Sequence, residues 1–178
     1  MDPRSPLVLS TYDLRAPGAL RRLRLVVPAP EDLSSGLVGI EAGSDLVLEL
    51  RLESVMEGVL VTGTATGSLA GECGRCLEPL SETLCVEMQE LFAYPGREPE
   101  DGEDELPRLE GEQLDLEPVV RDAIVTALPF QPVCRPDCPG LCPQCGARLA
   151  DGEHSHEVTD PRWAALRGLG SAGAPEES

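Results

Sequence analysis

Residues 45–53 carry the clearest structural signal in the chain and read Asp45-Leu46-Val47-Leu48-Glu49-Leu50-Arg51-Leu52-Glu53. Every second residue is a leucine, and most of the residues between them are charged. A strict two-residue period is typical of a strand that has one face in the core and the other in water. The run therefore predicts a half-buried strand.

Neighbouring segments extend this strand into a sheet. Strand-like runs also lie at residues 7–9, 23–27, 59–66 and 83–88. The run 59–66 is rich in β-branched residues, as strands commonly are. Cys73-Gly74-Arg75-Cys76 falls between the last two runs. The middle of the chain is therefore predicted to be an antiparallel meander with this turn at one hairpin end.

One amphipathic helix is predicted after the strands. Asp115 is a helix-capping residue, apolar residues recur at helical spacing from Leu116 to Leu128, and Pro129 ends the pattern. Asp160-Pro161 predicts the start of a short C-terminal helix. The predicted class is α+β: an antiparallel meander or barrel-like sheet with one packed helix, a compact cysteine-rich zinc knuckle and a short C-terminal helix.

The predicted organisation is a single domain over residues 1–169. It includes an acidic, flexible loop at about 94–113 and a cysteine-rich metal loop at about 132–157. Residues 170–178 are predicted to be a disordered tail.

Charge and cysteine content limit the classes of function. The formal net charge is −18, which favours a basic protein partner and repels nucleic-acid phosphates at long range. No apolar run reaches the roughly 18 residues of a membrane span, and no signal sequence is evident, so we expect a cytoplasmic protein with no membrane contact. In that reducing compartment, the 7 cysteines favour metal binding or redox chemistry over disulfides.

Four cysteines form the strongest motif. Cys134, Cys138, Cys142 and Cys145 follow the spacing C-x3-C-x3-C-x2-C, with several prolines between them. Two thiolates two residues apart on a tight turn can bind one zinc ion, and four thiolates make a closed structural site. The sequence therefore predicts one structural zinc ion at these four residues.

Alternative ligands lie nearby or in the predicted hairpin. His154 and His156 are able to replace one or two thiolates. Cys73 and Cys76 fit a second knuckle, a redox dithiol, a plain hairpin turn, or half of a zinc ribbon with Cys142 and Cys145. Cys85, alone in a strand, is expected in the core.

No catalytic residue is predicted. The sequence lacks a dinucleotide fingerprint, a phosphate-binding P-loop and a nucleophile elbow. We therefore expect a protein that is not an enzyme.

Several segments together resemble the YceD family, from about residue 9 to 169. They are residues 52–63, 72–79, 90–92, 122–129, 134–146 and 160–162. The resemblance implies a role in accumulation of large-subunit ribosomal RNA, with no established enzymatic activity. Some members of that family keep only the counterpart of Cys73 and Cys76, so the metal is expected to be a local staple.

The leading functional hypothesis is a ribosome-biogenesis factor that acts through a basic protein, such as a large-subunit ribosomal protein. Contact with ribosomal RNA would then be indirect. Two rival hypotheses stay open. One is a thiol-redox protein that uses Cys73 and Cys76. The other is an RNA-binding module that uses Arg15, Arg21, Arg22, Arg24 and Arg75.

Overall fold

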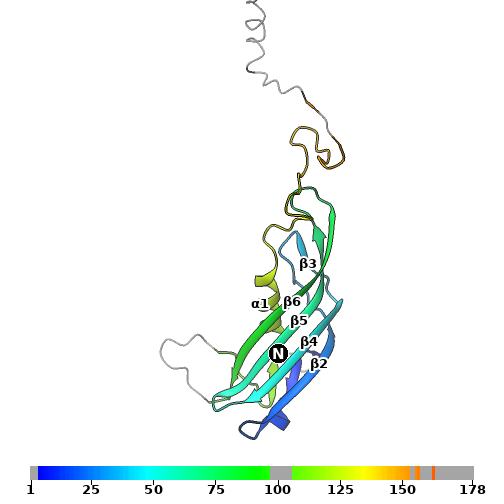
Figure 1. The fold of residues 1–178 in the computed structure, drawn as a ribbon. Helices are drawn as coiled ribbons and strands as arrows, with labels where there is room; N and C mark the ends of the chain where they lie inside the picture. The colour runs from blue at the N-terminus through cyan, green and yellow to red at the C-terminus, as the bar shows by residue number, and fades with distance from the viewer. Residues whose placement is uncertain (1–3, 97–105, 153–154, 157–161, 163–178) are drawn as a thin grey trace, which may run out of the picture. The chain divides into compact units, whose positions relative to one another are not determined.

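A computed structural model describes residues 4–96, 106–152, 155–156 and 162 of the chain (Figure 1). Contacts within the chain define two compact units, Met1–Cys138 and Pro139–Ser178. The single domain predicted over residues 1–169 stays a prediction, and the boundary between the two units falls after Cys138. Each unit is described by itself below.

The first unit is built on an antiparallel five-stranded sheet (Figure 1). Its strands are β2 (Leu20–Pro28), β3 (Val38–Ile40), β4 (Asp45–Ser54), β5 (Gly58–Glu72) and β6 (Pro79–Ala93). Strand β4 lies between β2 and β5, and β5 pairs with β6 along its whole length. Strand β3 pairs with residues 69–71 of β5, beyond the part that pairs with β4. The predicted meander is thus confirmed as β4–β5–β6.

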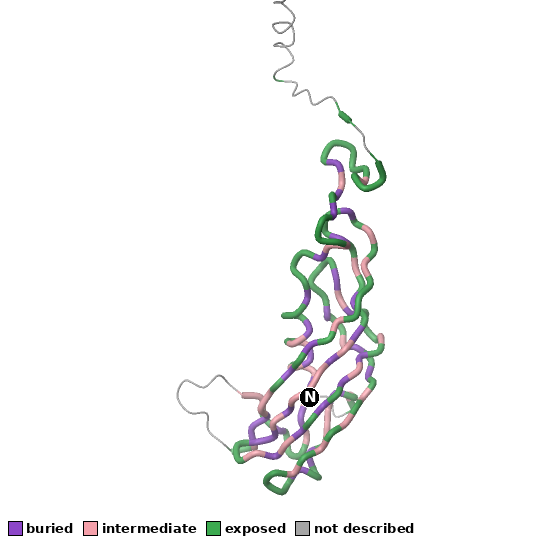
Figure 2. Tube along the Cα trace, viewed as in Figure 1, coloured by how far each residue is buried: buried purple, intermediate pink, exposed green. Residues whose placement is uncertain are grey.

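The register places the alternating leucines on one face. Leu48 lies opposite Leu25 of β2 and Ala65 of β5, and Ala65 lies opposite Val86 of β6. All four leucines of the quoted run are buried, whereas Glu49 and Arg51 are exposed. Burial consequently alternates along the strands (Figure 2). The sequence pattern predicted this face correctly.

The sheet is open, so the barrel-like form expected from the sequence is wrong. Among the described residues, β2 pairs only with β4, and β6 pairs only with β5 except for a single bridge between Ala93 and Arg108. The leucine face of the sheet belongs to a core cluster of buried residues, which also includes Leu114, Leu116, Val120 and Ile124 from β7, α1 and the residue between them. These elements bury the leucine face, so the sheet does not have to close on itself.

A second, two-stranded sheet contributes to this cover. Strand β1 (Val8–Ser10) pairs with β7 (Gln113–Asp115), with Leu9 opposite Leu114. A 3-10 helix, η1 (Tyr12–Leu14), follows β1 and buries Leu14. Strands β3 and β7 have three residues each and were not predicted.

The predicted acidic loop is anchored at its described ends. Residues 97–105 lie outside the described part of the chain. After them, Arg108 bridges to Ala93, and Leu109 is buried in the core cluster. Strand β7 begins at Gln113, within the segment that the sequence analysis assigned to the loop.

Helix α1 (Glu117–Ala127) confirms the predicted amphipathic helix. The Asp115 carboxylate accepts a hydrogen bond from the Glu117 N–H at 3.0 Å, and Pro118 occupies the first turn. Val120 and Ile124 are buried, and the helix packs against β6. The predicted C-terminal helix at 160–161 and the tail at 170–178 lie outside the described residues. No helix in the described part of the chain has both the length and the apolar character needed to cross a membrane.

Candidate metal centre

The β5–β6 hairpin ends in a tight six-residue turn that carries two cysteines. Glu72 and Pro79 form the last register pair, so residues 73–78 make up the turn. The Cys73 N–H donates to the Glu78 carbonyl at 2.8 Å, and the Leu77 N–H donates to the Cys73 carbonyl at 2.9 Å. These bonds bring the Cys73 and Cys76 side chains together on one side of the turn.

The chain that follows α1 meets this turn and supplies two more cysteines. The Gly74 N–H donates to the Pro132 carbonyl at 2.8 Å, which ties the two segments together. The Cys138 N–H donates to the Arg135 carbonyl at 3.1 Å and closes a second small turn. Cys134 and Cys138 therefore lie beside Cys73 and Cys76.

The four sulfur atoms have the spacing of a tetrahedral thiolate site. The Cys73 and Cys138 sulfurs are 3.8 Å apart, those of Cys76 and Cys134 are 3.6 Å apart, and all four lie within 4.8 Å of one another. In a tetrahedral site with Zn–S bonds of about 2.3 Å, the sulfurs are about 3.8 Å apart. The group can therefore hold a metal ion with four protein ligands, which leaves no position for a substrate.

Backbone amides support one sulfur in particular. The N–H groups of Arg75 and Cys134 both point at the Cys73 sulfur, at 3.4 Å each. Burial raises the pKa of the Cys73 thiol, but these N–H groups and that of Cys76 outweigh it and lower the pKa to about 6. Such N–H donors are typical of metal-bound thiolates, where they spread the negative charge.

The thiols of Cys76 and Cys134 favour the neutral form when no cation is present. Burial and the neighbouring thiols of Cys138, Cys76 and Cys73 raise the pKa of Cys134 to about 12. The pKa of Cys76 is also raised: the Glu78 N–H lowers it, but burial and the thiols of Cys73 and Cys138 outweigh that bond. A divalent cation would reverse this balance, because it favours deprotonation of every ligand.

The cluster is enclosed by few apolar side chains. Cys73, Cys76 and Cys138 are buried together, and among the described residues Leu80, Val133 and Cys134 are the partly buried hydrophobic residues that pack against them. The Arg75 guanidinium donates to the Cys138 carbonyl at 3.1 Å. Because so little apolar surface holds these segments, a metal would supply much of their order.

The structure divides the four predicted ligands between two groups. Cys134 and Cys138 lie with Cys73 and Cys76 in the first unit, whereas Cys142 and Cys145 lie with His156 in the second. His154 lies outside the described residues. Cys85 is exposed on the outer face of β6, so the expectation of a core cysteine was wrong.

Leu77 occupies a backbone conformation that suits glycine. Its φ is 59° and its side chain is 51% exposed. A left-handed conformation costs a residue with a Cβ roughly 1–2 kcal/mol. We expect Leu77→Gly to raise the free energy of unfolding by about 1 kcal/mol, measured by urea denaturation in buffer that contains zinc. Leu77→Ala keeps the Cβ and is the control; an equal gain in that variant would contradict the explanation.

Comparisons with known proteins agree with the earlier resemblance. The family model described as "Large ribosomal RNA subunit accumulation protein YceD" matches residues 61–170. Uncharacterized proteins Rv2926c of Mycobacterium tuberculosis and Mb2951c of Mycobacterium bovis are each 49% identical over 166 residues, covering 91% of this chain and 80% of the relative. Uncharacterized protein ML1660 of Mycobacterium leprae is 40% identical over 178 residues, covering 98% of this chain and 82% of the relative. No solved structure matches. The chain therefore belongs to the YceD family of large ribosomal RNA subunit accumulation proteins.

Proposed function

We propose that this protein supports assembly of the large ribosomal subunit by binding a basic protein, such as a large-subunit ribosomal protein, without catalysing a reaction. One structural zinc ion at Cys73, Cys76, Cys134 and Cys138 would fix the end of the β5–β6 hairpin. The family supports the ribosomal role. The net charge of −18 supports a basic partner, because electrostatic complementarity speeds encounter and selects among partners.

The observation that carries the proposal is an acidic groove between β6 and α1. The groove has a volume of about 680 Å³. Glu87 and Glu90 of β6 and Asp122 of α1 contribute carboxylates to it, beside apolar groups such as Val119 and Pro107. No lysine or arginine is among its described lining residues. An extended or helical segment with arginine or lysine and some apolar side chains would match this lining.

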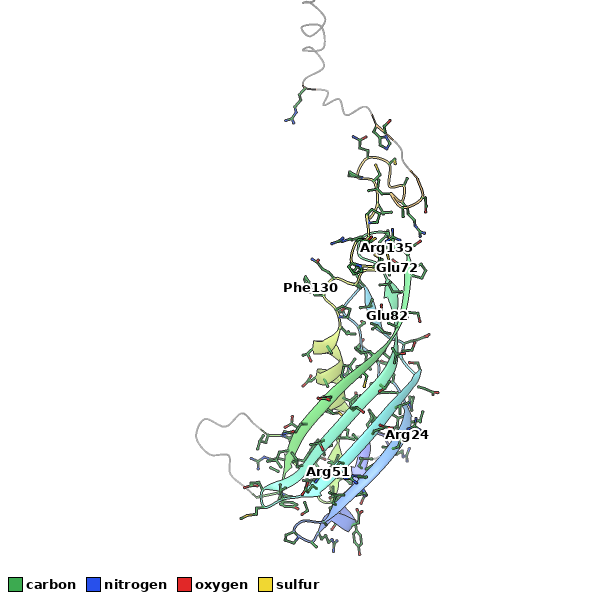
Figure 3. All side chains as sticks on the ribbon, viewed as in Figure 1. Arg24, Arg51, Glu72, Glu82, Phe130 and Arg135 are labelled. Carbon is green, nitrogen blue, oxygen red and sulfur yellow. The ribbon has the colours of Figure 1, made fainter. Side chains whose placement is uncertain are left out.

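Direct RNA binding has weaker support, because most of the arginines proposed to bind RNA already interact with acidic side chains or a carbonyl of the same chain. Arg15 pairs with Glu112, Arg21 pairs with Asp13 at 2.7 Å, and Arg24 pairs with Glu49 at 3.3 Å. The Arg75 guanidinium donates to the Cys138 carbonyl. Arg24 and Arg51 lie on the outer sheet face beside Glu49 and Glu53 (Figure 3). RNA would have to displace these carboxylates before it could use the arginines.

A thiol-redox role for Cys73 and Cys76 also has weaker support. A redox pair needs an accessible thiolate and usually opens a helix. Here the pair lies in a turn between two strands, and both residues are buried. Their sulfurs lie among four thiols at ligand spacing, which favours a structural role.

Neutralising the groove should weaken binding of the partner. We expect the triple change Glu87→Gln, Glu90→Gln, Asp122→Asn to reduce recovery of large-subunit ribosomal proteins at least tenfold. The measurement is co-purification from cells at graded salt, followed by mass spectrometry. Recovery by the unchanged protein should fall steeply as salt rises, because the attraction is between charged surfaces.

A matched control variant removes three negative charges that lie outside the groove. Glu41, Asp45 and Glu57 are exposed and lie outside the groove. The change Glu41→Gln, Asp45→Asn, Glu57→Gln should leave recovery nearly unchanged. Equal losses in both triple variants would show that net charge, not the groove, attracts the partner. Recovery of ribosomal RNA without ribosomal protein would contradict the proposal and favour direct RNA binding.

A further inference from the structure

The second unit contains a small hairpin that presents two cysteines on its turn. Leu141 and Arg148 form an antiparallel bridge, and the Leu149 N–H donates to the Gly140 carbonyl at 3.0 Å. Within the turn, the Cys142 N–H donates to the Ala147 carbonyl at 2.7 Å, and the Gly146 N–H donates to the Cys142 carbonyl at 2.8 Å. These bonds fix the backbone on both sides of Cys145.

A glycine makes this turn possible. Gly146 directly follows Cys145 and has a φ of 73°, which a residue with a Cβ adopts only at a cost. The backbone reverses at that point and turns the Cys145 side chain back toward Cys142. The motif resembles the turn at Cys73 and Cys76, where Leu77 holds the equivalent left-handed position with a φ of 59°.

A histidine joins the two cysteines. The sulfurs of Cys142 and Cys145 and a ring nitrogen of His156 all lie within 4.8 Å of one another. Cys142 is buried, whereas Cys145 and His156 are exposed. Zinc bound tetrahedrally by sulfur and nitrogen would require separations of about 3.5–3.8 Å, so any pair of these atoms would need to close by about 1 Å at most.

The described part of this unit has almost no apolar core. Among residues 139–152, 155–156 and 162, the buried hydrophobic side chains comprise Cys142 alone. An isolated two-stranded hairpin is marginally stable in water at best. Some other interaction must hold the hairpin and His156 together, and a metal ion bound by all three side chains would provide it.

We propose that Cys142, Cys145 and His156 form a second metal centre that binds zinc, separate from the four-cysteine group of the first unit. Two thiolates and one imidazole favour zinc over magnesium or calcium, which prefer oxygen ligands. The three residues leave the fourth coordination position to water or another ligand. This site therefore differs from the closed four-thiolate site in charge, ligand number and exposure. The proposal does not depend on the ribosomal role.

The test measures zinc in the full-length protein, purified without chelator. Elemental analysis should find about two zinc ions per chain. The change Cys142→Ser, Cys145→Ser should reduce this to about one, and so should Cys73→Ser, Cys76→Ser. Under a graded chelator, the ion at Cys142, Cys145 and His156 should leave first, because that site has one fewer protein ligand and two exposed ones.

Cobalt substitution separates the two sites by their ligands. Cobalt-loaded Cys142→Ser, Cys145→Ser protein should keep the spectrum of a four-thiolate site. Cobalt-loaded Cys73→Ser, Cys76→Ser protein should show weaker thiolate charge-transfer absorption from two sulfurs. In that same background, His156→Gln should weaken cobalt binding at least tenfold, as loss of one of three protein ligands predicts.

Cys85→Ser changes an exposed cysteine outside both groups and should keep two ions. Far-ultraviolet circular dichroism should show an intact sheet in every variant of the second unit. The proposal is overturned if the unchanged protein binds only one zinc ion, or if Cys142→Ser, Cys145→Ser still binds two. Loss of the second ion in His154→Gln but not in His156→Gln would also overturn the ligand assignment.

Discussion

Replacing Cys73 and Cys76 by serine should abolish the zinc binding proposed for the first unit and disorder the end of the β5–β6 hairpin. The affected backbone should be residues 72–79 together with 129–138, because the Gly74–Pro132 hydrogen bond and the four sulfurs join these two segments. Structural zinc contributes on the order of 10 kcal/mol to small loops that cannot fold alone. Partial burial of Leu80 and Val133 replaces only a small part of that contribution.

The main sheet should survive this change. Its core cluster includes Leu46, Leu48, Val59 and Val61 and contains none of the cysteines. Each buried side chain of this kind contributes roughly 1.5–3 kcal/mol, so the sheet has its own source of stability. Hydrogen exchange followed by mass spectrometry should therefore show fast exchange at 72–79 and 129–138 and slow exchange across 45–66.

Two outcomes would contradict this expectation in different ways. Fast exchange that spreads through residues 45–66 would mean that the metal organises the whole unit. Full retention of zinc would favour the ligand set first predicted from the sequence, Cys134, Cys138, Cys142 and Cys145. Cys85→Ser is the matched control and should alter neither zinc content nor exchange, because Cys85 belongs to neither group.

The strands of the sheet were predictable because the pattern that defines each strand lies within a few consecutive residues. The leucines at 46, 48, 50 and 52 repeat every two residues, and their burial needs only one apolar layer above them. The same holds for α1: Asp115, whose carboxylate accepts a hydrogen bond from the Glu117 N–H, and Pro129, which follows the helix, both lie within a few residues of it. Sheet closure was not predictable, since it depends on what else covers the leucine face.

The cysteines of the candidate metal site were harder to group, because the two pairs that meet there are distant in sequence. Spacing alone joins Cys134 and Cys138 to Cys142, which is four residues from Cys138. In the structure, the Cys138 sulfur instead lies 3.8 Å from the sulfur of Cys73, which is 65 residues earlier in the chain. Strand β6 runs about 46 Å away from the turn at 3.3 Å per residue. Helix α1 and the segment after it bring the chain back. The sequence offered Cys73 and Cys76 as alternative ligands, but no local signal paired them with Cys134 and Cys138.

Replacing Phe92 by alanine should cost about 3–5 kcal/mol of unfolding free energy, the usual range for a buried phenylalanine. Phe92 is only 1% exposed and belongs to the main core cluster. It lies opposite Val59 near the end of β6, on the same face as Val86 and Met88. Alanine would leave a cavity there, because the paired strands hold the surrounding backbone in place.

The chain provides a matched control, since its other phenylalanine is almost fully exposed. Phe130 follows α1, is 92% exposed and points away from the ribbon (Figure 3). Phe130→Ala should change the unfolding free energy by less than about 0.5 kcal/mol. Both variants are compared with the unchanged protein by guanidinium denaturation with zinc present, followed by circular dichroism. A cost below about 1 kcal/mol for Phe92→Ala would show that the β6 end of the core is loosely packed. A large cost for Phe130→Ala would instead mean that its ring is covered in solution, for example by a partner copy.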